Sequence, residues 1–328
     1  MTLITRRTLL GLAAAACAPV ALAQPAANPA AWPERPIKLI VPLPPGGAYD
    51  YIGRLMADHL RTSLNGTVVV ENKFGAGARI GTEFVARAPA DGYTFLLMAS
   101  THVILPSMVQ KLPYDAIRDF EPVSRIVDSP MALVVNPNVQ ARSVAELVGL
   151  SKAKPDSLAY GSSGTGSPFH LAGELLKLRA GVLAIHVPYK GTGPLMNALL
   201  ANEVPMAFVP IGPYLPHLRS GKLRAVAVVS RAPSELLPGV PTLGSTIPLP
   251  SGMESWVGMV APAGTPRPIV ERMSAELRKI VTDPQLKSRL MDQGYEPVGS
   301  TPQELAQVMR DGLASYARLV QDAKIQPE

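Results

Sequence analysis

A loop rich in serine, threonine and glycine carries the side chains that could do chemistry in this sequence. It runs from Tyr160 to His170, reads YGSSGTGSPFH, and continues into LAGELLK, which is typical of a helix. Ser163 and His170 could form a nucleophile–base pair. However, Thr165 stands where the G-x-S-x-G nucleophile elbow needs its second glycine. No acidic residue is evidently placed to orient His170, so a hydrolase is the weaker interpretation, and His170 is expected to support the loop or a ligand oxygen.

Binding of an anion is the interpretation that these small residues favour. They let a ligand approach the backbone closely, and the free N–H groups at the start of the following helix favour a negative charge. An earlier loop of the same kind, from Val41 to Asp50, reads VPLPPGGAYD and is the first of the two loops along the chain. We expect the two loops to face each other across a cleft and to hold a carboxylate between them. Asp50 is expected to cap the helix that follows the first loop.

Other candidate sites are weaker. The spacing G-x-G-x-x-x-G from Gly75 to Gly81 is one residue too long for the dinucleotide fingerprint and favours a tight strand–helix loop. The five histidines include no close pair of ligands, so we expect neither a metal nor a cofactor. Lys190 is the best candidate for charge complementarity to the ligand, and a solvent-exposed loop lysine is the alternative.

Short apolar runs predict strands, and both loops directly follow such runs. Strands are predicted at residues 37–41, 67–70, 93–98, 157–160, 184–187, 204–209 and 255–260. Helices are predicted at residues 50–64, 144–153, 194–201, 268–281, 285–293 and 302–323, with Thr301 or Ser300 as cap of the last and Glu304 as its capping-box partner. Strand–helix alternation is typical of a parallel sheet that is covered on both faces.

Two lobes follow from this order of elements. Residues 35–125 and 231–328 are expected to form the first lobe and residues 126–230 the second. The segment 123–135 would cross between the lobes, and the β-rich run 223–230 would return the chain. Ligands of such architectures bind between the lobes, at the carboxyl ends of strands.

The N-terminus is expected to be a cleaved signal peptide over residues 1–23. Arg6 and Arg7 precede an apolar run that ends in Ala-Leu-Ala, which is typical of a signal-peptidase site, and the arginine pair leaves both the general and the twin-arginine export routes open. The one cysteine, Cys17, lies in this segment, so the mature chain would contain no disulfide. Residues 24–34, rich in Pro and Ala, are expected to be a flexible leader.

Composition fits a packed globular protein. The chain has 328 residues, of which 47% are hydrophobic and 17% charged, and this suits one large or two medium domains. The formal net charge is +6, but no stretch concentrates it as a nucleic-acid-binding surface would. We therefore expect no nucleic-acid partner, and we expect a monomer.

Motifs along nearly the whole predicted mature chain resemble those of the Bug family, the substrate-binding proteins of tripartite tricarboxylate transporters. In the first lobe these are PPGGAYD from residue 44, VEN from 70, GAG from 75, DGYT from 91, KLPYD from 111 and DFEPV from 119. In the second they are YGSSG from 160, GSPFHLAGE from 166, VPYKG from 187 and LPHLRSGKLRA from 215. PT at 241, Trp256 and APAGTP from 261 complete the set.

The resemblance implies an α/β periplasmic-binding-protein (Venus flytrap) fold, with two doubly wound lobes and a ligand cleft between them. It implies a periplasmic, non-enzymatic protein that captures a small organic carboxylate for a membrane permease of the tripartite tricarboxylate type. A sensor that presents its closed form to a membrane signalling partner is the alternative. The candidate ligand-binding residues that follow are Gly46, Gly47, Ala48, Tyr49, Ser100, Thr101, His102, Ser163, Thr165, Gly166, Ser167, His170, Lys190 and Val209.

The sequence departs from the family pattern in three places. Tyr49 replaces a smaller residue, Lys73-Phe74 replaces Arg-Pro, and the segment 207–210 lacks a common Asp or Asn. The lost polar group is a natural partner for a ligand ammonium, and an unpaired buried ammonium is costly. We therefore expect a carboxylate without an amino group. Tyr49 and Phe74 would either floor a pocket for a flatter or more apolar acid, or pack outside the cleft.

Overall fold

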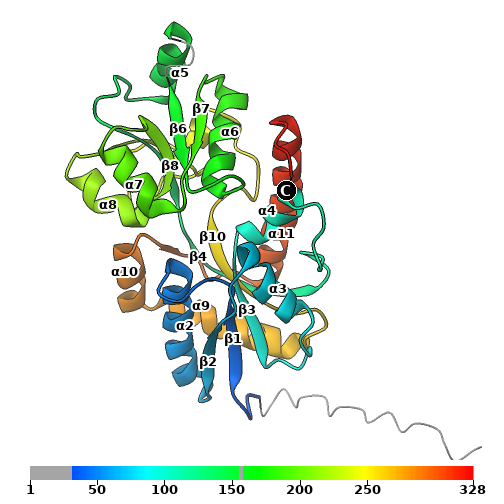
Figure 1. Cartoon of the computed structure of the whole chain (residues 1–328). Helices are drawn as coiled ribbons and strands as arrows, with labels where there is room; N and C mark the ends of the chain where they lie inside the picture. The colour runs from blue at the N-terminus through cyan, green and yellow to red at the C-terminus, as the bar shows by residue number, and fades with distance from the viewer. Residues whose placement is uncertain (1–31, 155–157, 328) are drawn as a thin grey trace, which may run out of the picture.

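The computed structural model describes residues 32–154 and 158–327. The predicted signal peptide, with Cys17, and most of the predicted leader lie outside these ranges. Figure 1 shows two lobes, each of which is built on one β-sheet with helices on its faces. Within the described residues, no helix is both long enough and apolar enough to cross a membrane.

The first lobe contains a six-stranded sheet in the order β11-β4-β10-β3-β1-β2. Its strands are β1 (Ile37–Val41), β2 (Val68–Asn72), β3 (Thr94–Ala99), β4 (Phe120–Asp128), β10 (Trp256–Pro262) and β11 (Glu296–Pro297). β1 pairs in parallel with β2 and β3, whereas β10 runs antiparallel to β3 and β4. The helices of this lobe are α2 (Ala48–Leu64), α3 (Arg79–Ala86), α4 (Thr101–Met108), α9 (Arg267–Thr282), α10 (Pro284–Asp292) and α11 (Pro302–Asp322).

The second lobe contains a five-stranded sheet in the order β7-β6-β8-β5-β9. Its strands are β5 (Met131–Val135), β6 (Ala159–Ser162), β7 (Ile185–Pro188), β8 (Met206–Pro210) and β9 (Arg224–Val228). β6 is parallel to β7 and β8, and β5 is antiparallel to β8 and β9. Its helices are α5 (Val144–Ala153), α6 (Pro168–Ala180), α7 (Thr192–Leu200) and α8 (Ile211–Arg219).

The chain passes between the sheets at two places. β4 belongs to the first sheet and β5 to the second, with Pro130 between them. β9 pairs with β5 and so remains in the second sheet, and the chain re-enters the first sheet only at β10. The run 223–230 is therefore not the returning segment, because its strand completes the second sheet.

Alternating side chains explain why both faces of the first sheet are covered. Phe95 and Leu97 of β3 join a core cluster with residues of α2 and α9, whereas Leu96 and Met98 join a second cluster with residues of α4 and α11. α11 begins with the predicted capping box, in which Thr301 and Glu304 each accept a backbone hydrogen bond from the other.

α4 and α8 were not predicted, because prolines in their sequences are typical of turns. Pro106 lies inside α4, and Pro213 and Pro216 lie in α8. Pro213 falls in the first turn of α8, where backbone N–H groups have no partner within the helix, so its missing N–H costs no hydrogen bond. Both helices contribute to the cavity described below.

Candidate functional site

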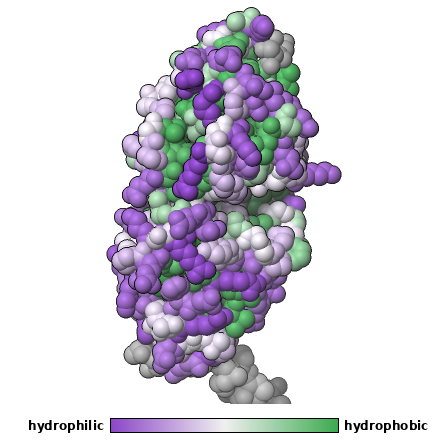
Figure 2. All heavy atoms as spheres, turned by 90° about the vertical axis from the view of Figure 1, so that its left-hand side faces the viewer, coloured by the Kyte–Doolittle hydropathy of each residue, from purple (hydrophilic) through white to green (hydrophobic). Residues whose placement is uncertain are grey.

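A cavity of 680 Å³ lies between the two sheets and is lined from both lobes. Figure 2 shows the surface hollowed at the level where the lobes meet. The lining loops follow the carboxyl ends of β1 and β3 in the first lobe and of β6, β7 and β8 in the second. This is the edge at which α/β proteins bind ligands, because helix N-termini and flexible loops gather there.

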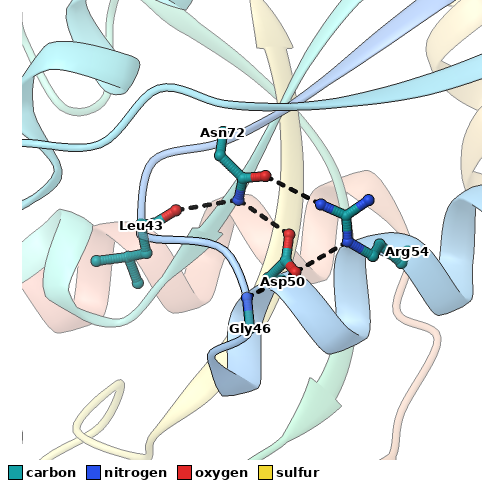
Figure 3. Close-up of polar contacts among 5 residues, drawn as sticks. All are labelled: Leu43, Gly46, Asp50, Arg54 and Asn72. Carbon is teal, nitrogen blue, oxygen red and sulfur yellow. Dashed lines mark hydrogen bonds and ion pairs between the residues drawn. The ribbon is translucent and has the colours of Figure 1, made fainter.

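The first loop is held in shape by Asp50, as Figure 3 shows. The Asp50 carboxylate accepts hydrogen bonds from Gly46 N at 2.9 Å, Arg54 Nε at 2.9 Å and Asn72 Nδ2 at 2.9 Å. The hydrogen bond from Arg54 is the largest cause that lowers the pKa of Asp50 to about 2, so this carboxylate stays ionised. Asn72 Nδ2 also donates to the carbonyl of Leu43, which ties the start of the loop to its end.

Asp50 therefore acts differently from the expected helix cap. α2 begins at Ala48, and Asp50 lies in its first turn with Gly47 at the capping position. Its carboxylate accepts the N–H group of Gly46, which precedes the helix. The consequence is that the Gly46 N–H group is occupied within the protein, whereas the N–H groups of the first turn of α2 have no partner inside the helix.

The second loop is built around the start of α6. Ser167 caps α6 by accepting a hydrogen bond from His170 N at 3.2 Å, and Gly166 N donates to His170 Nδ1 at 3.1 Å. Gly166 has a φ of 75°, a conformation that glycine adopts without strain. Thr165 lines the cavity, and within the described residues neither its N–H nor its hydroxyl group has a hydrogen-bond partner. Thr165 is thus free to bind a ligand.

Two stacked histidines support this loop. The rings of His170 and His186 lie 4.0 Å apart between centroids, and His186 Nε2 lies 2.7 Å from Ser162 Oγ. Burial lowers the pKa of His170 and lowers that of His186 to about 4. His170 Nδ1 accepts the Gly166 N–H group, and only a nitrogen without a proton can do so. A neutral His170 therefore positions the loop.

The predicted site residues divide into two groups. The structure brings seven of them into the cavity lining: Ala48, Tyr49, Thr101, Ser163, Thr165, Gly166 and Ser167. It places the other seven outside the lining: Gly46, Gly47, Ser100, His102, His170, Lys190 and Val209.

Packing explains the positions of His102 and Val209. His102 packs against the rings of Tyr114 and Phe120, and its Nε2 lies 2.8 Å from the carbonyl oxygen of Ala116. Burial lowers the pKa of His102 to about 4. Val209 is fully buried in the core cluster that also contains Ala207, on the face of β8 opposite to Phe208. Both residues therefore lie in the core rather than at the cleft.

Three of the residues singled out from the sequence lie on the surface or at the cavity wall. Lys190 is exposed on the surface. Phe74 is 54% exposed and lies outside the cavity lining, whereas Tyr49 contributes to it. Burial raises the pKa of Tyr49 to about 12, so this phenol remains neutral and can donate a hydrogen bond.

Sequence reasoning missed part of the lining. Arg79, at the first position of α3, contributes the one charged side chain among the described residues that line the cavity. Arg79 belongs to the glycine loop after β2, where the spacing of the glycines predicts a tight strand–helix loop and gives no sign of a ligand contact. Ile104, Leu105 and Met108 were missed because α4 was not predicted.

The lining is suited to the binding of an anion. It combines backbone N–H groups, hydroxyl groups and one guanidinium with apolar walls, and among its described residues there is no carboxylate and no histidine. In the part of the chain that the structure describes, no three His, Cys, Asp or Glu side chains are grouped to hold a metal ion. This combination is typical of a site that binds a small molecule.

Comparison with known proteins gives a consistent result. Residues 52–325 match the family described as "Tripartite tricarboxylate transporter family receptor" (TctC). BugT of Bordetella pertussis is 36% identical over 294 residues, which cover 89% of this chain and 90% of BugT.

Solved structures agree with the sequence match. The structure of periplasmic binding protein BugD has a TM-score of 0.73 at 34% identity and covers 90% of this chain and 100% of its own. The structure of Rpa4515 from R. palustris with adipate has a TM-score of 0.76 at 31% identity, with the same coverage of 90% and 100%. The chain therefore belongs to the tripartite tricarboxylate transporter receptor (TctC) family, adopts the periplasmic-binding-protein fold, and is a solute-binding protein rather than an enzyme.

Proposed function

We propose that this protein captures a small organic carboxylate in the cavity between its lobes and delivers it to a membrane permease of the tripartite tricarboxylate type. The observation that carries the proposal is the chemistry of the lining. The described lining residues supply hydrogen-bond donors and one guanidinium, and they include no acidic side chain that would repel an anion. The likeness to a structure that contains adipate supports the same ligand class.

Two helix N-termini contribute to this preference for an anion. α2 begins at Ala48 and α6 at Pro168, and both residues line the cavity. The N–H groups of a first turn have no partner inside the helix and carry the positive end of its dipole. In α6, Pro168 has no N–H group and Ser167 accepts that of His170, so the first turn offers the N–H group of Phe169. A carboxylate between the two loops would accept hydrogen bonds from this group, from the first turn of α2 and from Thr165. Binding of this kind needs the lobes to hold the ligand from both sides.

The same lining disfavours a ligand ammonium. A buried ammonium needs a carboxylate or several acceptors, and the described lining residues include no Asp or Glu. We therefore propose a carboxylate without an amino group. The predicted signal peptide and the family membership support a location in the periplasm, where the protein would meet its ligand before the permease does.

Isothermal titration calorimetry tests the ligand class. Adipate should bind, and its uncharged diamide should not, because the amide removes the negative charge and keeps the shape. Thr165→Val should weaken adipate binding about tenfold, since it removes a donor to a charged group. Thr62→Val is the matched control, because Thr62 is exposed on α2 and absent from the cavity lining. Equal affinity for acid and amide would contradict the proposal.

A further inference from the structure

Arg79 differs from Arg54 and Lys73, two other cations beside the ligand loops. Arg54 pairs with Asp50 at 2.9 Å, and Lys73 pairs with Glu71 at 3.9 Å. Arg79 has no ion-pair partner within the described residues, although it lines the cavity and is half-buried. A guanidinium that faces a cavity without acidic residues is complementary to an anionic group from outside the protein.

The guanidinium of Arg79 is also oriented. Its Nε donates a hydrogen bond to the carbonyl of Ala76 at 2.7 Å, which fixes the side chain against the turn that precedes α3. Its two terminal nitrogens have no partner among the described residues. Because the guanidinium is planar, the remaining donors form a fork that matches the two oxygens of a carboxylate.

Neighbouring groups place Arg79 on the α4 side of the cavity. Burial raises the pKa of Tyr114 to about 12, and the nearby positive charge of Arg79 opposes that rise. Tyr114 stacks against His102 of α4, with ring centroids 6.1 Å apart. Arg79 therefore lies near Tyr114 and, through it, toward α4.

The wall on this side is apolar. Ile104, Leu105 and Met108 of α4 and Phe169 of α6 line the same cavity as Arg79. Met108 reaches across to the second loop, since a Cβ atom built on Gly166 would lie 3.0 Å from Met108 Cε. A ligand on this side thus meets one guanidinium, the polar loop at the start of α6, and an apolar wall.

We propose that Arg79 is a specificity-determining residue that binds a second acid group of the ligand, so that the protein prefers dicarboxylates with an apolar chain over monocarboxylates of equal length. One carboxylate would bind between the two loops and the other on Arg79, with the chain against α4 and Phe169. This assignment rests on the proposed function, because it requires a carboxylate ligand in this cavity.

The assignment is tested by measuring how a change at Arg79 affects the affinities for two types of ligand. Calorimetry would compare the wild-type protein and Arg79→Gln with dicarboxylates of about four to eight carbons and with the matching monocarboxylates. Arg79→Gln should lower the affinity for the preferred dicarboxylate about tenfold and change that for the matching monocarboxylate less than about twofold. Arg79→Lys should restore part of the preference, because it returns the charge without the fork.

Lys190→Gln is the matched control, since it also removes one positive charge but from an exposed side chain outside the lining. It should leave both affinities unchanged, and thermal denaturation would establish that each variant is folded. An equal loss for both ligand types in Arg79→Gln, or no loss for either, would overturn the assignment while leaving carboxylate binding intact. If the wild-type protein bound none of these acids, the proposed function itself would be contradicted, and the assignment with it.

Discussion

At the scale of single residues, His170 shows how a side chain outside the cavity can determine the shape of its wall. Its ring Nδ1 accepts a hydrogen bond from Gly166 N, its backbone N–H group donates one to Ser167 Oγ, and its ring stacks against His186. These contacts hold the loop that presents Ser163 and Thr165. The histidine that a hydrolase interpretation would make a base is therefore a positioning residue for a binding loop.

Buried histidines should make the stability of the protein depend on pH. Burial lowers the pKa of His102 to about 4, whereas an unfolded histidine titrates near pH 6.5. Between these values the unfolded state binds more protons than the folded state, so the free energy of unfolding falls as the pH is lowered. Urea denaturation should give a clearly lower free energy of unfolding at pH 5 than at pH 7.5.

The variant His102→Gln isolates this contribution. Its amide can still donate to the Ala116 carbonyl but cannot titrate. The slope of the free energy of unfolding against pH should therefore decrease by up to about 1.4 kcal/mol per pH unit. His59→Gln, on the exposed face of α2, serves as the comparison variant for the loss of a histidine outside the core. An unchanged slope in His102→Gln would refute this account of the pH dependence.

At the scale of elements, α8 and the turn after α10 close one side of the cavity. Gly212 of α8 and Gly294 after α10 both line it. A Cβ atom on Gly212 would lie 2.3 Å from the carbonyl oxygen of Gln293, and one on Gly294 would lie 2.1 Å from Gly212 Cα. The two lobes therefore meet here through backbone, and only glycine at position 212 permits this approach.

The variant Gly212→Ala should weaken ligand binding by at least about tenfold, because the added methyl group would push the lobes apart. Gly149→Ala in α5 is the matched control, since no atom lies within 4 Å of the position of its Cβ. Calorimetry would measure the affinities, and small-angle X-ray scattering would detect wider lobe separation in the ligand-bound Gly212→Ala variant. Wild-type affinity in Gly212→Ala would show that this contact is not needed for binding.

At the scale of the whole molecule, the two lobes share one apolar cluster in addition to two chain crossings. Ile104 of α4, Leu171 of α6 and Leu319 of α11 belong to the same core cluster. In Figure 1, α11 starts in the first lobe and extends beside α6 of the second, and the two helices are in contact. The lobes are therefore joined on the α11 side, while α8 and the turn after α10 meet on another.

Much of this arrangement could be predicted because it depends on local patterns. β-branched runs identified strands such as β1, and small residues after strands identified both ligand loops. The prolines of α4 and α8 prevented the prediction of these two helices, because a helix tolerates a proline at some positions and not at others. The directions of side chains were also hidden: Lys190 and Arg79 are both loop cations in sequence, and only the tertiary structure shows which of them reaches the cavity.

The central claim is that a carboxylate binds between the loop from Ser163 to Ser167 and the start of α2. A crystal structure of the protein with its tightest-binding acid tests this most directly. We predict a carboxylate within hydrogen-bond distance of Thr165 and of the first-turn N–H groups of α2, with the ligand enclosed by both lobes. A ligand bound outside this cavity, or one whose acid group faces solvent while its chain contacts the loops, would contradict the account.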